Sequence, residues 1–573
     1  MSNVHDIVIR VGGESGEGVI STGELLTLAA ARAGFWVYTF RTYPAEIKGG
    51  HAVFQLRVSD KPLYSQGDSL NALLAFNQEG YDKHHQDLRP DGTVVFDTEQ
   101  VDEATVKESR KFGLPLSRIA KEEIKMPLAK NMVALGALAR LFSIPEEYTN
   151  KLCKEKFAKK GDAVIQKNLE ALAAGKSYIE KNFADLEQFH IRVQPSELRL
   201  VLSGNEAIGL GALVAGCTHY FGYPITPASD IMEFLATELP KVGGIMMQVE
   251  DEIAALGMAL GASYAGKKVM TATAGPGLSL MTELLGLAGM AEVPVVVADI
   301  QRAGPSTGMP TKTEQGDLNL AAFGAHGESP RIVIAPINVE DCFYTTVTAF
   351  NLAERYQVPV LLLSDQALAT RNECIPKPDL AKVKVFDRLI HRDGEGNNNY
   401  LRYQYTEDGV SPMALPGTPG GAYVATGLEH SEAGRPRYDP VTHTKMTEKR
   451  FQKLARAVAD FPRVDTYGDA GAELGIVSWG STLGAVREAV ERAQAQGIKI
   501  LSFYPRVLYP LPDGYLIDQL KRVKRLIVPE VNSQGQFANL IEQRYRGEVI
   551  RYNIYGGLPF RAGEILKKIE EVA

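Results

Sequence analysis

The stretch FGYPITPASD at residues 221–230 holds one hydroxyl, that of Thr226, between two prolines. Proline disfavours helical backbone in the residue before it, so Tyr223 and Thr226 are expected to be extended. Pro227 suits the first position of a helix, which would make Thr226 the N-cap of that helix. A helix start that follows a strand also attracts anions, so the Thr226 hydroxyl could instead donate to a bound carboxylate.

Three consecutive acids, Glu250, Asp251 and Glu252, precede a helical pattern that is rich in alanine and glycine. Acids at a helix start are favoured by the helix dipole, and this role alone would explain them. The small residues, however, would let the helix pack closely on a neighbour. A partly buried carboxyl at its start could then share a proton with a cofactor.

Arg302 stands just beyond the apolar run VVVADI, and Lys312 follows ten residues later in a long loop. Open α/β sheets bind their ligands outside the carboxyl ends of the strands. The planar guanidinium group of arginine matches the geometry of a carboxylate. Arg302 is therefore a candidate carboxylate ligand, although a surface salt bridge would also explain its presence.

Two glycine-rich turns, GGESGEG at 12–18 and GNEAIGLG at 204–211, each follow an apolar run and open a helical pattern. Backbone N–H groups in such a turn favour a bound phosphate or carboxylate. The first turn lacks the Lys–Ser/Thr pair of a P-loop and departs from the dinucleotide-binding fingerprint. A tight strand-to-helix turn needs glycine for conformational reasons alone, so these turns indicate architecture and leave ligand binding open.

The candidate residues must be positioned by strands that alternate with helices. Buried strands are predicted within 267–274, 293–300, 330–336 and 358–365. Three blocks repeat the order strand, glycine turn and helix, beginning near residues 6, 198 and 473. This alternation implies parallel sheets covered by helices, so the predicted fold class is α/β with three doubly wound units.

Shifts in composition predict how these units divide the chain. The segment 146–187 is charged and helical, and 391–459 begins with a stretch that is dense in glycine, proline and asparagine. We therefore predict a first domain over 1–192, a second over 193–390, an irregular connection over 391–459 and a third domain over 460–573.

The bulk composition indicates a globular protein. The chain has 573 residues, of which 45% are hydrophobic and 23% charged, and its formal net charge is -7, which argues against a nucleic-acid scaffold. No apolar run approaches the ~18 residues of a membrane span, and the charged N-terminus does not resemble a signal peptide. We expect a cytoplasmic protein.

The four cysteines, Cys153, Cys217, Cys342 and Cys374, are far apart in the sequence and form no CxxC pattern. We expect buried free thiols, because free cysteine is among the most buried residue types. The adjacent His84 and His85 do not share a helix face, so no metal site is expected from them.

Four pieces in sequence, YPITP, EIAALGMALGAS, TATAGPG and GPSTGMPTKTEQGDL, resemble the α subunit of the 2-oxoacid:ferredoxin oxidoreductases, which use thiamine diphosphate. GGESGEGVISTGELLTLAAARAG and TYPAEIKGGHAVFQLRVSD are similar to the γ subunit of that family. VPEVNSQGQ and the block 470–573 resemble the transketolase C-terminal-like domain. The likeness covers nearly the whole chain and is greatest to the 2-oxoglutarate type, with a γ-like Rossmann-type domain fused ahead of a pyrimidine-binding-type domain.

The resemblance implies roles for residues around the cofactor. It implies that Glu252 hydrogen-bonds the pyrimidine of thiamine diphosphate, with Glu250 as a less favoured register. Tyr223, Pro224 and Ile225 would also contact the cofactor.

The resemblance also implies that Thr226 binds the carboxylate of the oxoacid and that Arg302 assists it. A dicarboxylate needs a second cation, because a buried unpaired carboxylate is costly. We hypothesise that Lys312 supplies that cation, with Lys48 or Arg41 as helpers. A coenzyme A region would comprise Gly13, Glu14, Ser15, Gly16, Arg41 and Lys48.

The implied reaction interconverts 2-oxoglutarate, coenzyme A and oxidised ferredoxin with succinyl-CoA, carbon dioxide and reduced ferredoxin. Some enzymes of this type run towards carbon dioxide fixation, as in a reductive TCA cycle. The chain has no GDG-plus-Asn pattern for Mg²⁺ and diphosphate and no clustered cysteines. The resemblance therefore implies a separate β subunit that carries the diphosphate, Mg²⁺ and a [4Fe-4S] cluster, in a dimer of αβ heterodimers. Pyruvate or a branched-chain 2-oxoacid as substrate, and a non-catalytic binding or assembly role, remain alternatives.

Overall fold

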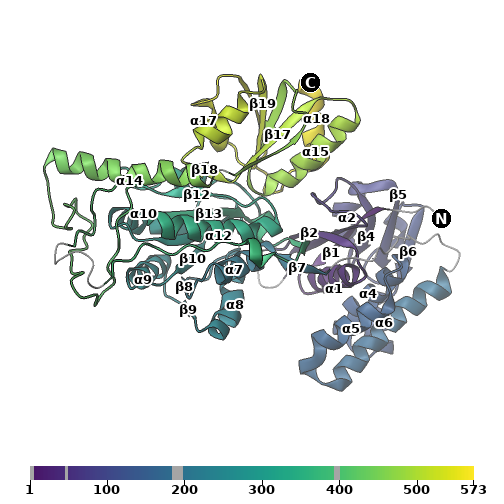
Figure 1. Ribbon diagram of the computed structural model, residues 1–573. Coiled ribbons are helices and arrows are strands. Elements are labelled where there is room, and N and C mark those ends of the chain that lie inside the picture. The colour runs from purple at the N-terminus through teal and green to yellow at the C-terminus, as the bar shows by residue number, and fades with distance from the viewer. Residues whose placement is uncertain (1–4, 45–48, 184–197, 393–399, 462) are drawn as a thin grey trace. The chain divides into compact units, whose positions relative to one another are not determined.

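The computed structural model describes residues 5–44, 49–183, 198–392, 400–461 and 463–573. They form two compact units (Figure 1). The first unit contains Met1–Leu202 with Arg371–Lys377, and the second contains Ser203–Thr370 with Pro378–Ala573. The predicted domain boundary at 192–193 lies outside the described residues.

The first unit is built on an eight-stranded mixed sheet in the order β6-β5-β4-β1-β3-β2-β14-β7. Strand β1 runs parallel to β4 and antiparallel to β3, so this sheet is not purely parallel. Its strands are β1 (Asp6–Glu14), β2 (Trp36–Thr42), β3 (His51–Ser59), β4 (Leu70–Ala75), β5 (Leu88–Asp97), β6 (Arg110–Leu114), β7 (Arg199–Ser203) and β14 (Asn372–Pro376).

Helices pack against this sheet and bury an apolar core. The charged segment 146–187 contains two helices, as its helical pattern predicts, and the second of them also packs on α4. The main helices of the unit are α1 (Val19–Arg32), α2 (Gln78–His84), α4 (Lys130–Leu141), α5 (Glu146–Phe157) and α6 (Asp162–Asn182).

The second unit contains a seven-stranded sheet in the order β18-β12-β13-β11-β10-β8-β9. All four buried strands predicted from the apolar runs are present and run parallel to their neighbours; β18 alone pairs antiparallel. The strands are β8 (His219–Gly222), β9 (Ile245–Gln248), β10 (Val269–Thr273), β11 (Val295–Gln301), β12 (Ile332–Ile334), β13 (Pro359–Asp365) and β18 (Val507–Tyr509).

One face of this sheet is covered by α9, α10 and α11, which share a core with the side chains of Val295, Val297, Leu361 and Leu363. Helix α12 packs on α7. The helices of this part are α7 (Gly204–Val214), α8 (Ser229–Glu238), α9 (Glu252–Tyr264), α10 (Gly275–Met290), α11 (Leu318–Phe323) and α12 (Val339–Tyr356).

A five-stranded sheet in the order β15-β17-β16-β19-β20 forms the C-terminal part of the same unit. Its strands are β15 (Val464–Gly468), β16 (Leu474–Val477), β17 (Ile500–Pro505), β19 (Arg525–Glu530) and β20 (Glu548–Asn553), and its helices include α15 (Leu483–Ala495), α17 (Gln536–Glu542) and α18 (Ala562–Val572). The chain therefore has three sheets rich in parallel pairs, which confirms the predicted α/β fold class.

The prediction of an irregular connection over 391–459 misses a long helix at the end of that segment. Residues Pro440–Asp460 form α14, a helix of 21 residues (Figure 1). Its buried face includes Lys449 and Lys453, whose Nζ atoms lie 2.6 and 2.8 Å from carboxylate oxygens of the fully buried Glu292. Burial would raise the pKa of Glu292, but the two ammonium groups hold it far below its ordinary value. The same face also buries Met446, Leu454, Ala457 and Val458 at helical spacing, so the sequence of this segment does contain a helical period.

All four cysteines are free and buried, as their spacing predicts. Burial raises the pKa of the Cys153 thiol to about 11 and that of Cys217 to about 12, so these thiols are unreactive at neutral pH. Among the helices that the structure describes, none has both the length and the apolar content needed to cross a bilayer.

Candidate functional site

Two of the site residues predicted from the sequence, Thr226 and Arg302, meet at the carboxyl ends of β8 and β11. Thr226 follows β8 by a few residues, and Arg302 follows β11 directly. Nη1 of Arg302 donates to the backbone oxygen of Thr226 over 2.7 Å. Strand β10 lies between the two strands, so the parallel sheet itself brings these distant residues together, at the edge where α/β sheets bind ligands.

The structure contradicts the prediction that Thr226 caps a helix. Helix α8 begins at Ser229, its N-cap is Ala228, and no side chain caps it. The backbone N–H groups of Ala228 and Ser229 donate instead to the carbonyl of Ile225, over 2.8 and 3.0 Å. The amides that a cap at Thr226 would bind are thus already satisfied. Among the described residues, no hydrogen bond involves the Thr226 hydroxyl, which leaves it available to a ligand.

The neighbouring residues differ in exposure. Tyr223 is 40% exposed, whereas Pro224 and Ile225 are partly buried. The Thr226–Pro227 peptide bond is cis, and Nδ2 of the buried Asn205 donates to the carbonyl of Pro227 over 2.8 Å. The turn is therefore anchored on the first turn of α7.

Glu252 and Asp251 have separate roles at the start of α9. Asp251 is the N-cap, and its Oδ1 accepts a hydrogen bond from the backbone N–H of Ala254 over 2.7 Å. Glu252 is the first helical residue and is only 7% exposed. No hydrogen bond or ion pair to its carboxylate is found within the described part of the chain. Glu250, by contrast, is exposed.

The first turn of α10 accommodates this carboxylate because it contains glycine. A Cβ atom at Gly277 would lie 2.7 Å from Cγ and Oε1 of Glu252 and 2.0 Å from Oγ1 of Thr273. A Cβ at Gly275 would lie 2.6 Å from Oδ2 of Asp317. The TATAGPG motif is therefore explained by the close approach of two acidic side chains to the start of α10.

Arg302 is buried beside Asp317. The guanidinium group is 8% exposed, and its Nε has no hydrogen-bond partner among the described residues. Burial lowers the pKa of Arg302, and the charge of Asp317 opposes that shift. A buried guanidinium group with an unused donor is suited to bind an anionic ligand.

Lys312 is brought towards Arg302 by a backbone hairpin. The N–H of Ala303 donates to the carbonyl of Lys312 over 2.9 Å, and Ala303 also pairs with Met309. Gly308 closes the hairpin with φ +52°, where a Cβ would lie 1.9 Å from the carbonyl of Ala303. The stem of Lys312 packs near Gly557, where a Cβ would lie 2.9 Å from its own Cβ.

The loop that follows Lys312 is held by the segment between β19 and α17, a contact that the motifs alone do not predict. The N–H of Gln315 donates to the carbonyl of Val531 over 2.6 Å, and Oε1 of Gln315 accepts from the N–H of Val531. Nδ2 of Asn532 donates to the carbonyl of Gln315 over 3.0 Å. Gln536 donates to the carbonyl of Gly316 and accepts from the N–H of Asn319, over 2.7 and 2.8 Å.

These contacts give the VPEVNSQGQ motif a structural role. Asn532, which follows β19, and Gln536, the first residue of α17, are buried amides that bond the backbone of the loop after β11. Two such amides four residues apart, next to a glycine, were the only sequence signal for this role. The C-terminal part of the chain thus helps to fix the loop that carries Lys312 and Asp317.

The predicted coenzyme A region lies in the first unit, at the end of β1. Its turn already binds one of its own acids, because the N–H of Glu14 donates to Oε2 of Glu17 over 2.8 Å. Arg41 pairs with Glu24 over 3.2 Å. Gly13, Ser15 and Gly16 complete this turn, whereas Lys48 lies outside the described residues. The coenzyme A region stays a prediction.

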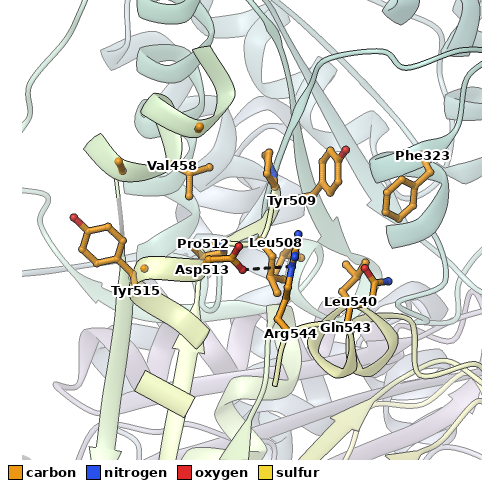
Figure 2. A pocket seen from close by; sticks show the side chains of 15 residues that line it. Phe323, Val458, Leu508, Tyr509, Pro512, Asp513, Tyr515, Leu540, Gln543 and Arg544 are labelled. Atoms are coloured by element: carbon orange, nitrogen blue, oxygen red, sulfur yellow. Dashed lines mark ion pairs between the residues drawn. The ribbon is translucent and has the colours of Figure 1, made fainter. Parts of the chain in front are cut away.

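A separate cavity of about 510 Å³ lies elsewhere in the second unit (Figure 2). Apolar side chains such as Phe323, Leu508 and Leu540 line it, and its charged groups are Asp513 and Arg544, which lie 3.7 Å apart. Both charged side chains are more than half exposed, and none of the site residues above lines the cavity. It does not offer the buried charges that a carboxylate site needs.

Within the part of the chain that the structure describes, no group of three or more His, Cys, Asp or Glu side chains is arranged to hold a metal ion. The strand ends instead collect an arginine, a hydroxyl and buried carboxyls. A mainly parallel sheet with these groups at its carboxyl edge defines an α/β protein, and the unused arginine donor at that edge is suited to an anionic ligand.

Comparison with known families assigns the chain to one of them. Residues 210–449 match the thiamine diphosphate-binding domain of pyruvate flavodoxin/ferredoxin oxidoreductases, residues 8–178 match the pyruvate ferredoxin/flavodoxin oxidoreductase domain, and residues 472–566 match core domain II of pyruvate:ferredoxin oxidoreductase. The chain belongs to the 2-oxoacid:ferredoxin oxidoreductase family, as its motifs predict.

Relatives match over almost their whole length. The 2-oxoglutarate oxidoreductase subunit KorA of Mycobacterium tuberculosis is 35% identical, over 98% of this chain and 91% of that protein. The α subunit of 2-oxoacid:ferredoxin oxidoreductase 2 from Aeropyrum pernix is 33% identical, over 94% and 92%. The structure is similar to that of 2-oxoglutarate:ferredoxin oxidoreductase from Magnetococcus marinus, solved with 2-oxoglutarate, coenzyme A and succinyl-CoA bound, with 45% identity, 99% coverage of both chains and a TM-score of 0.94.

Proposed function

We propose that this chain is the α subunit, with a γ-type domain fused ahead of it, of a thiamine-diphosphate-dependent 2-oxoglutarate:ferredoxin oxidoreductase. The enzyme would convert 2-oxoglutarate, coenzyme A and oxidised ferredoxin to succinyl-CoA, carbon dioxide and reduced ferredoxin, or run in reverse. The observation that carries the proposal is the hydrogen bond that joins Arg302 to Thr226 at the strand ends. Glu252, whose side chain is buried against the first turn of α10 in the same unit, supports it.

Glu252 fits the role of a cofactor ligand. A buried carboxylate without a protein partner is costly, and a ring nitrogen of the cofactor would supply that partner. Tyr223, Pro224 and Ile225 precede Thr226 and would line the same ring. Thiamine diphosphate, when bound, would supply the reactive carbon and the electron sink for decarboxylation. Glu252 would hold the proton at the pyrimidine side.

Thr226 and Arg302 would hold the oxoacid carboxylate. Nε of Arg302 is a buried donor without a protein partner among the described residues, and the hydrogen bond between Nη1 of Arg302 and the Thr226 carbonyl joins the guanidinium group to the backbone of Thr226. A preformed donor lowers the entropic cost of binding. The second carboxylate of 2-oxoglutarate would be bound by Lys312.

The rest of the active site would come from a β subunit. It would supply Mg²⁺, the diphosphate contacts and a [4Fe-4S] cluster that passes electrons to ferredoxin. Helix α9 presents exposed apolar side chains next to Glu252, with Ile253 50% and Met258 38% exposed. An apolar surface beside half a site supports contact with a partner chain. We propose a dimer of αβ heterodimers in the cytoplasm, with coenzyme A bound near Gly13–Gly16.

The experiment that tests this function is reconstitution of the chain with its β subunit. The complex should reduce viologen in the presence of 2-oxoglutarate and coenzyme A, and more slowly with pyruvate or a branched-chain 2-oxoacid. If pyruvate were the only oxoacid that supported viologen reduction, 2-oxoglutarate would be refuted as the substrate. A complex without activity on any 2-oxoacid would favour a binding or assembly role.

The role of Glu252 has a matched control in Glu250, an exposed glutamate two residues earlier. In the reconstituted complex, Glu252→Gln should lower turnover by about a hundredfold or more, since a neutral amide cannot take up the proton. Glu250→Gln exchanges the same groups at an exposed position and should retain the parent activity. Equal activity of the two variants would remove Glu252 from the mechanism.

A further inference from the structure

Asp299 is an acid that the proposed function does not yet use. It lies on β11, is 0% exposed, and neither of its carboxyl oxygens has a hydrogen-bond partner among the residues that the structure describes. Asp365, at the end of the next strand, is equally buried, but it accepts hydrogen bonds from the N–H of Leu368 and the hydroxyl of Thr313, over 3.1 and 3.3 Å. Burial of an ionised carboxylate without donors is costly, so Asp299 is expected to carry a proton.

Asp317 is held at the same strand ends as Asp299. It bonds Gln301, two residues after Asp299 on β11, and its carboxylate lies against Gly275, two residues after Thr273, the residue paired with Asp299 on β10. The N–H of Asp317 donates to Oε1 of the buried Gln301 over 3.0 Å, which holds the start of α11 at the end of β11. Its carboxylate lies against the first turn of α10, near Gly275, and its Oδ2 has no partner within the described residues. Asp317 also interacts electrostatically with Arg302, so it links Asp299 to the oxoacid site.

The two acids influence each other. Burial, and then the charge of Asp317, raise the pKa of Asp299 well above its ordinary value. Burial and the charge of Glu314 raise the pKa of Asp317 to about 6, and Arg302 acts in the opposite direction. Like charges at a shared site cannot both be held easily, so one proton remains on the pair.

The other groups around the pair do not compensate a second negative charge. On the neighbouring strands Asp299 lies beside Thr273 and Leu363. The first turns of α10 contain no ionisable residue. Glu252, on α9, is a further acid, and its carboxyl lies against the position of a Cβ at Gly277. Among the described residues, Arg302 is a cation that acts on Asp317, while Glu314 is another acid.

We propose that Asp299 and Asp317 share one proton and act as a positioning pair for the oxoacid site. In this arrangement Asp317 carries the negative charge that faces Arg302, and Asp299 stays protonated. The single negative charge of the pair and the positive charge of Arg302 then sum to zero, and the guanidinium group can bind the oxoacid carboxylate. Loss of the shared proton would place a second negative charge behind Arg302 and weaken oxoacid binding. The proposal rests on the proposed function of Arg302.

The test uses the reconstituted αβ complex and the variant Asp299→Asn, whose amide has the shape of a protonated aspartate. In the parent complex, kcat/KM for 2-oxoglutarate should fall by about tenfold as the pH rises and the shared proton is lost, because the second negative charge behind Arg302 weakens binding of the oxoacid. In Asp299→Asn the neutral-pH value should be retained and this alkaline fall should be absent. The change should appear in KM rather than in kcat.

A control variant and a spectroscopic measurement make the test specific. Asp251→Asn makes the same exchange at the N-cap of α9, where asparagine caps as well as aspartate, and should keep the parent pH profile. Infrared difference spectra at neutral pH, parent minus Asp299→Asn, should contain the carbonyl band of a protonated carboxyl. Superimposable pH profiles, or a spectrum without that band, would overturn the proposal. The infrared measurement needs no turnover, so it separates failure of the pair from failure of the proposed function.

Discussion

Asp251 and Glu252 are adjacent acids with different environments, and the backbone at the helix start causes the difference. The N-cap has extended φ and ψ of -157° and 174°, which turn the Asp251 carboxylate back onto the N–H of Ala254. Glu252 already has helical geometry, and its longer side chain reaches the first turn of α10. A shift by one residue would exchange a surface cap for a buried, unpartnered carboxylate.

Lys312 offers a test at the residue scale. Lys312→Ala should raise KM for 2-oxoglutarate by about tenfold to a hundredfold in the reconstituted complex, since a hydrogen bond to a charged group contributes about 1.5–3 kcal/mol. Turnover of pyruvate, which has no distal carboxylate, should change little. The measurement is steady-state viologen reduction with both oxoacids.

The control for Lys312 is Lys382→Ala, because the Lys382 side chain is 81% exposed and pairs only with Asp379 on the surface. That variant should behave as the parent with both oxoacids. If Lys312→Ala impaired pyruvate and 2-oxoglutarate turnover equally, Lys312 would not recognise the distal carboxylate.

At the scale of elements, the start of α10 organises the acidic side of the site. Gly277→Ala would place a methyl group 2.0 Å from Thr273 and 2.7 Å from Glu252. Overpacking of this kind costs about 1–3 kcal/mol, and here it would displace the Glu252 carboxylate. We expect a lower unfolding temperature of the chain, weaker thiamine diphosphate binding by the complex, and turnover reduced by about a hundredfold.

Helix α10 also contains the control for this substitution. Gly286 lies nine residues later in the same helix, and no atom lies within 4 Å of a Cβ at that position. Gly286→Ala should therefore leave activity unchanged and stabilise the helix by up to about 1 kcal/mol. Normal binding of thiamine diphosphate by the Gly277→Ala complex would show that the close approach of Glu252 to α10 is not needed for cofactor binding.

The elements that the sequence predicted well are those with an apolar period. Strands β10 and β11 appear as uninterrupted apolar runs because both of their faces are buried in a parallel sheet. Helix α14 has such a period too, with Met446, Leu454 and Val458 on its buried face, but it was included in the irregular segment that precedes it. Its ion pairs with Glu292, which stands more than 150 residues earlier, have no local sequence pattern.

Only part of the site could be predicted from the sequence, because element boundaries can be located in it but most packing contacts cannot. Arg302 and Glu252 stand at the boundaries of recognisable elements, so their placement followed from the α/β rule. The role of Thr226 as a cap was wrong because the Ile225 carbonyl had already bound the amides in question. Asp299 was not singled out, since its lack of partners is a property of the packed structure and not of the apolar run that contains it.

At the scale of the whole molecule, the C-terminal sheet supports the loop that carries Lys312 and Asp317. Gln536→Leu would leave the carbonyl of Gly316 and the N–H of Asn319 without their partner. Unsatisfied buried groups cost about 1–3 kcal/mol each. We expect a lower unfolding temperature and a KM for 2-oxoglutarate that rises more than kcat falls.

Gln534→Leu is the comparison for this variant, because Gln534 is exposed and the hydrogen bonds described for it use its backbone. It should retain the parent KM and stability. If Gln536→Leu lowered stability without changing KM, the C-terminal sheet would stabilise the fold but would not position the site.

Strand β14 determines how this chain can be divided. The polypeptide leaves the second unit at Arg371, supplies β14 to the first sheet between β2 and β7, and re-enters the second unit at Pro378. A single cut near residue 202 would therefore not yield two complete pieces, because the N-terminal piece would lack a strand inside its sheet and would expose unpaired strand edges. The two units are interlaced along the polypeptide rather than joined end to end, so a gene coding for them could be split into independent subunits only if β14 were replaced or lost.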